Sequence, residues 1–61
     1  MALQVRQGYG GNLIVETSSR EQIGIVSTKD GSILFLDAKP LKVSRVDAAR
    51  MVRHAVRDYL D

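Results

Sequence analysis

Four side chains near the C-terminal end of the sequence have the type and spacing to bind a phosphate backbone. Positively charged or titratable nitrogen groups recur at intervals of three and four residues at Arg50, Arg53, His54 and Arg57. Because an α-helix turns by about 100° per residue, this spacing places all four side chains within one sector of a helix. Such a ridge can follow the phosphates of a nucleic acid. The four residues are therefore candidate nucleic-acid contacts.

The same pattern has an ordinary alternative, which is a solvated helix face without a binding role. Three carboxylates lie three or four residues from a member of the group, namely Asp47, Asp58 and Asp61. Ion pairs at these spacings would reduce the positive charge of the ridge. No aromatic residue is interleaved with the arginines, so the helix alone provides no platform for stacking bases.

Three further residues are candidate contacts outside this group. Lys42 lies just before the helical pattern and would add one more phosphate contact. Arg6 and Tyr9 are secondary candidates, contributed from the sheet that we predict for the first half of the chain. An exposed tyrosine among glycines could stack on a base, or it could fold back over the edge of the sheet.

The glycine-rich segment Gly8–Asn12 (GYGGN) could also present backbone N–H groups to a phosphate. However, the lysine–threonine ending of a Walker motif is absent, and a strand rather than a helix follows. The pattern favours the flexible tip of a β-hairpin.

Enzymatic chemistry is not indicated. His54 and Asp58 are four residues apart and could be imagined as part of a triad with a serine, but this spacing is also that of an ordinary helix surface pair. No serine lies in the strained turn that such a nucleophile requires, and the chain is too small to enclose a cleft. One histidine and no cysteine cannot build a zinc site. We expect no catalytic residue, no metal and no cofactor.

A single amphipathic helix positions the candidate residues. The segment Ser44–Leu60 has apolar residues at spacings of three and four, namely Ala48, Ala49, Val52, Ala55, Val56 and Tyr59. Ser44 occupies the N-cap position, with Asp47 three residues later in a shortened capping box. The helix is therefore expected over Arg45–Leu60, with its apolar face on a sheet.

Strand and turn signals fill the rest of the chain. Alternating or β-branched segments bounded by turn residues predict four strands, at Leu3–Gln7, Leu13–Thr17, Ile23–Thr28 and Ser32–Asp37. Leu41–Val43 alternates as well and could add a fifth, short edge strand after the turn at Pro40. Gly24 indicates a bulge or a close backbone approach, and Asp30–Gly31 predicts a tight turn with the glycine at positive φ.

The fourth predicted strand suggests self-association. Ile33 and Phe35 form one apolar alternating set and Leu34 and Leu36 the other, so both faces of the strand should be covered. One face can meet the helix. A chain of 61 residues with three aromatic residues has no second helix to cover the other face. We therefore expect a second copy of the chain to cover it and form a homodimer.

Composition and charge describe one small globular domain over residues 1–61. The net charge of +2 comes entirely from residues 31–61, because basic and acidic residues balance in residues 1–30. The longest apolar run, Ile33–Leu36, is far too short for a membrane span, and no basic-then-apolar leader opens the sequence. These features predict a soluble, cytoplasmic protein.

The order of elements resembles that of the single-stranded-DNA-binding domains of the positive-cofactor-four family. In that family, four or five strands precede one C-terminal helix, the domains pair as dimers, the sheets face nucleic acid, and the helices contribute to the dimer interface. The resemblance covers order and length only. Strands Leu13–Thr17 and Ser32–Asp37 lack the strongly basic residues of the family, so no site residue is transferred.

Together these patterns predict an α+β fold, a small antiparallel meander of four or five strands with one C-terminal helix packed on one face. They favour a non-enzymatic nucleic-acid-binding protein, of DNA or RNA, that acts as a dimer through its basic surface. The alternative is a protein–protein interaction module, an accessory or inhibitor protein that uses its sheet edge or its second apolar sheet face.

Overall fold

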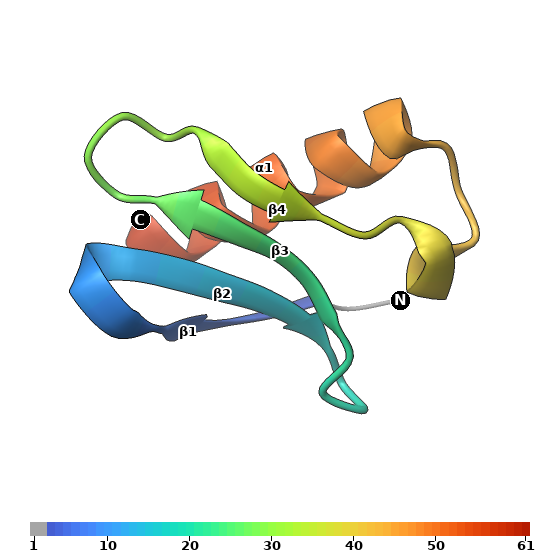
Figure 1. Ribbon diagram of the computed structural model, residues 1–61, viewed down its shortest axis with the longest axis horizontal. Coiled ribbons are helices and arrows are strands. Elements are labelled where there is room, and N and C mark those ends of the chain that lie inside the picture. The colour runs from blue at the N-terminus through green and yellow to red at the C-terminus, as the bar shows by residue number, and fades with distance from the viewer. Residues whose placement is uncertain (1–2) are drawn as a thin grey trace.

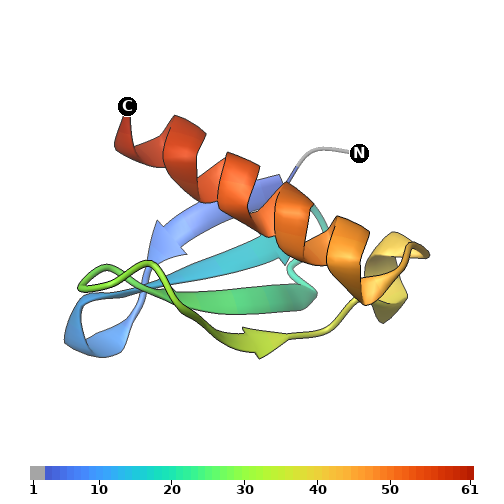
Figure 2. The ribbon, with the colours of Figure 1, turned by 90° about the horizontal axis from the view of Figure 1, so that it is seen from above.

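The computed structural model describes residues 3–61 and confirms the α+β fold (Figure 1). Four antiparallel strands follow one another in the sheet in sequence order, at β1 Leu3–Gln7, β2 Asn12–Thr17, β3 Gln22–Ser27 and β4 Ile33–Leu36. One helix, α1 at Arg45–Leu60, then lies obliquely across a single face of the sheet (Figure 2). The opposite face of the sheet carries no helix.

Small apolar residues hold α1 on the sheet. Ala48 and Val52 have no exposed surface, and Val56 is 9% exposed. The strands contribute the larger residues of this core, namely Leu13, Val15, Ile23 and Val26. The predicted N-cap is confirmed, because the Asp47 backbone N–H donates to the Ser44 hydroxyl oxygen at 3.2 Å. The apolar period of the helix and its cap therefore fix which face points outward.

Gly24 lies at a β-bulge and in close contact with its neighbours, as the sequence predicts. A Cβ atom at this position would lie 3.1 Å from the Phe35 carbonyl oxygen and 3.4 Å from a methyl group of Val52. Next to it, Val15 pairs with Gly24 and Glu16 pairs with Gln22, which leaves Ile23 as an extra residue in the register. This β-bulge turns Ile23 into the core, where it is fully buried.

The expected alternation of the fourth strand is wrong, because β4 is bulged as well. Ile25 pairs with Phe35 and Val26 pairs with Ile33, so Leu34 has no partner. The extra residue brings Ile33 and Leu36 together onto the core and leaves Leu34 58% and Phe35 44% exposed. The chain itself therefore covers one side of this strand and not the other.

The predicted fifth strand does not form. Lys39–Leu41 is a short 3₁₀ helix, in which the Leu41 backbone N–H donates to the Ala38 carbonyl oxygen at 3.1 Å. Pro40 supplies a helical φ and has no backbone N–H group that needs an acceptor. Burial of the Leu41 side chain stabilises the turn. Lys42 then ends the 3₁₀ helix in a left-handed conformation, with φ of 57°.

The tip of the first hairpin is hydrogen-bonded rather than loose. Tyr9–Gly11 forms a 3₁₀ turn with Gly10 and Gly11 at positive φ, closed by a 2.8 Å hydrogen bond from the Gly8 N–H to the Asn12 carbonyl oxygen. The Thr28 hydroxyl group donates to the Gly11 carbonyl oxygen. The tip is therefore tied to the loop between β3 and β4.

Candidate nucleic-acid interface

The outer face of α1 brings the four predicted basic residues together. Arg50, Arg53, His54 and Arg57 are all exposed, and they line one shallow depression of about 260 Å³. We call these four residues the basic cluster. The basic cluster faces solvent because the opposite side of the helix, with Ala48, Val52 and Val56, is buried against the sheet.

No carboxylate neutralises the basic cluster. Within residues 3–61 the one ion pair joins Arg6 to Glu16 at 3.3 Å, on the other side of the sheet. The pairs that the alternative interpretation requires, with Asp47, Asp58 or Asp61, are not formed. Three guanidinium groups therefore line one depression, and in residues 3–61 none of them forms a direct ion pair, which is an arrangement that attracts an anion.

A second depression adjoins the first and is mainly apolar. It has a volume of about 370 Å³ and lies between the C-terminal half of α1, strand β3 and the β3–β4 loop. The residues that line this apolar groove are Val26, Gly31, Arg53, Val56, Arg57, Leu60 and Asp61. Arg53 and Arg57 line both depressions, so they form the boundary between a basic surface and an apolar one.

Sequence reasoning missed the apolar groove, because its walls come from two distant parts of the chain. Val26 and Gly31 lie on the sheet side, and no helical period links them to α1. The one available signal is Leu60, an apolar residue that ends the helix and is 65% exposed. A large exposed apolar residue beside arginines marks a surface that the helix does not use for its own core.

The loop that forms one wall of the groove has a defined conformation. Gly31 adopts a φ of 74°, which confirms the predicted positive φ, and the Ser27 N–H donates to the Ser32 carbonyl oxygen at 2.9 Å. The Asp30 carboxylate accepts hydrogen bonds from the Ser32 backbone N–H at 3.0 Å and from the Ser32 hydroxyl group at 2.8 Å. These hydrogen bonds lower the pKa of Asp30 below its ordinary value, and the bond from the Ser32 backbone N–H has the larger effect.

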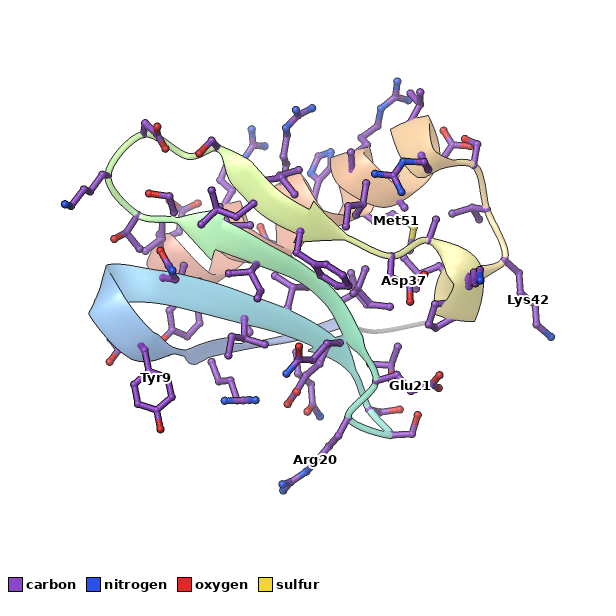
Figure 3. The ribbon with its side chains drawn as sticks, in the orientation of Figure 1. Tyr9, Arg20, Glu21, Asp37, Lys42 and Met51 are labelled. Carbon is purple, nitrogen blue, oxygen red and sulfur yellow. The ribbon has the colours of Figure 1, made fainter. Side chains whose placement is uncertain are left out.

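The remaining predicted contacts lie outside the basic cluster. Lys42 is exposed beyond the 3₁₀ helix, at the end of the molecule opposite Tyr9 (Figure 3). Tyr9 is 95% exposed at the tip of the first hairpin, so it does not cap the sheet edge. Arg6 is engaged with Glu16 on the uncovered face of the sheet. The structure therefore does not combine these three residues with the cluster into one surface.

Three other arrangements can be checked in residues 3–61: a hydrogen-bonded His54–Asp58 pair, free backbone N–H groups in the glycine-rich tip, and a cluster of metal ligands. Among the hydrogen bonds of residues 3–61, none joins His54 to Asp58, and the Gly8 N–H of the glycine-rich tip already donates to Asn12. In the same part of the chain, no three histidine, cysteine or acidic side chains gather as metal ligands. Over residues 3–61, α1 is too short and too polar to cross a bilayer.

In comparisons with known proteins, no family model matches this chain, and no curated protein or solved structure matches it.

Proposed function

We propose that this protein binds the phosphate backbone of a nucleic acid through the outer face of α1. The observation that supports the proposal is the basic cluster, in which Arg50, Arg53 and Arg57 line one depression with no acidic partner. Arginine is suited to this task because its planar guanidinium group can donate two parallel hydrogen bonds to a phosphate.

The size of the cluster sets the expected strength of binding. Seven residues separate Arg50 from Arg57, which corresponds to about 10 Å along the helix axis at about 1.5 Å per residue. A surface of this length contacts a short stretch of backbone, with one phosphate for each arginine. Three contacts give a slope of log affinity against log salt of about −2 for a single strand. A fourfold rise in salt should therefore lower the affinity about 20-fold.

Homodimerisation through the uncovered sheet face is the second part of the proposal. The register places Ile14, Ile25 and Phe35 side by side across three strands, with Arg6 next to Ile14 on the first strand. A second copy packed on this row would remove apolar surface that the chain leaves in water.

Fluorescence anisotropy with labelled single-stranded and duplex oligonucleotides tests the phosphate contacts. We expect binding that weakens with salt as described and that is lost when Arg50→Glu and Arg53→Glu are combined. Arg20→Glu with Lys39→Glu is the matched control, because both side chains are exposed outside the cluster and the net charge changes by the same amount. Absence of binding at low salt up to about 100 μM, the weak end of nonspecific affinities, would refute the proposal.

The apolar row on the uncovered face also favours a second candidate function, binding of another protein. In that case Phe35 and Ile25 would contact the partner, and the arginines would serve only for solubility. Salt separates the two functions, since release of counterions makes phosphate binding steeply salt-dependent and burial of an apolar row does not. A pull-down that depends on Phe35, together with no oligonucleotide binding, would favour the second function.

A further inference from the structure

Arg53 and Arg57 lie between two surfaces of different chemistry, and one ligand could contact both. On one side they continue into the basic cluster with Arg50 and His54. On the other side they border the apolar groove, where Leu60 is the exposed apolar side chain and the buried residues Val26 and Val56 lie beneath it. A molecule that joins an anionic group to a flat apolar group would match this pair of surfaces.

The charges around the groove give such a ligand one orientation. Asp61 is the one carboxylate among the described residues that line the groove, whereas none lines the depression of the basic cluster. Anionic groups are therefore favoured more strongly on the Arg50 side than inside the groove. A nucleotide has this construction, because a phosphate and a flat base are joined through one sugar.

We infer that the nucleic acid bound by α1 is single-stranded and that one unpaired base occupies the apolar groove while its neighbouring phosphates contact the basic cluster. The inference rests on the proposed function and specifies its ligand. The base packs against Val56 and Leu60, and the guanidinium groups of Arg53 and Arg57 stack on its exposed part.

A duplex fits this arrangement poorly. Its bases are paired and stacked inside the double helix, so a base could enter the groove only by being extruded, with loss of its pairing and stacking. An unpaired strand offers its bases without that cost. Among the described residues, the groove is lined mainly by apolar and arginine side chains, which contact the face of a base rather than its hydrogen-bonding edge, so contact with the base should be tolerant of sequence.

Three labelled ligands test the inference: an oligothymidine of about ten nucleotides, an abasic strand with the same number of phosphates, and a duplex of about ten base pairs whose affinity is compared per phosphate. We expect the oligothymidine to bind about tenfold more tightly than the abasic strand, the scale of covering one exposed leucine side chain with an apolar surface. Leu60→Ser should reduce the affinity for oligothymidine to that for the abasic strand and leave abasic binding unchanged.

Val46→Ser is the matched control, because Val46 is an exposed aliphatic residue on the same helix, 70% exposed, and lines neither depression. Circular dichroism verifies that both variants keep the fold. Equal affinities for oligothymidine and the abasic strand, tighter binding of the duplex, or an equal loss for all ligands in Leu60→Ser would overturn the inference but leave phosphate binding intact. Failure of every ligand to bind at low salt would instead refute the proposed function.

Discussion

The two faces of the sheet are both apolar at their centres, but only one of them is closed. On the covered face, Leu13, Val15 and Val26 are at most 3% exposed beneath the small residues of α1. On the uncovered face, Ile14 and Ile25 are half-buried and Phe35 is 44% exposed. The covered face therefore stabilises the fold, whereas the uncovered face leaves apolar surface in water.

The largest expected effect comes from placing a charge on the covered face. Val52→Asp puts an unpaired carboxylate at a position with no exposed surface, and the cost exceeds the few kcal/mol by which so small a domain is stable. We expect the variant to be unfolded by circular dichroism and by amide proton dispersion. Val46→Asp is the control, because Val46 is 70% exposed on the same helix. A folded Val52→Asp protein would show that α1 does not close the core.

Crowding of the same face should have a smaller effect. In Gly24→Ala, the new methyl group would lie 3.1 Å from the Phe35 carbonyl oxygen, a backbone atom that moves only if β4 moves. We expect a loss of about 1–3 kcal/mol in the free energy of unfolding, the usual range for overpacking, measured by urea denaturation. Unchanged stability would mean that β3 and β4 can separate locally without cost.

A polar residue on the uncovered face should change association and leave the fold intact. Phe35→Ser removes the largest side chain of the exposed row, at a cost of about 1 kcal/mol or less to the monomer, since Phe35 is already 44% exposed. Light scattering after size-exclusion chromatography should give a dimer for the wild-type chain and 6.7 kDa for the variant. A wild-type monomer at tens of micromolar would contradict the dimer proposal.

The smallest expected effect distinguishes a structural arginine from a binding arginine. Arg6→Ala leaves the Glu16 carboxylate, in a residue only 5% exposed, without its ion-pair partner. Because the Arg6 side chain is half-exposed, the loss in unfolding free energy should be no more than about 1 kcal/mol. Oligonucleotide affinity should be unchanged. Lost affinity with unchanged stability would instead make Arg6 a nucleic-acid contact.

The sequence was sufficient for features that depend on one element. The period of Ala48, Val52 and Val56 predicted both the buried face of α1 and, by exclusion, the position of the basic cluster. The Ser44 cap and the positive φ of Gly31 are likewise local, because they depend on the side chains and backbone of a few adjacent residues.

Features that depend on two elements were not predictable in the same way. The bulge at Leu34 allows Ile33 and Leu36 both to pack on the core. This packing depends on the position of α1, which the sequence of the strand does not contain. Leu41 alternates like a strand residue, but its burial favours a 3₁₀ turn at Pro40. The apolar groove requires β3 and the end of α1 to meet, which no spacing within either segment encodes.

The bulged edge strand has a consequence for aggregation. An open sheet edge is a template on which further strands can add without limit, and long flat edges lead to fibres. Here β4 has four residues and a bulge at Leu34, and the Arg45 side chain donates to the carbonyl oxygen of Leu36 at 3.2 Å. A short, twisted and partly occupied edge is a poor template. If the chain associates through the apolar row as we propose, growth of a filament along the β4 edge is therefore disfavoured.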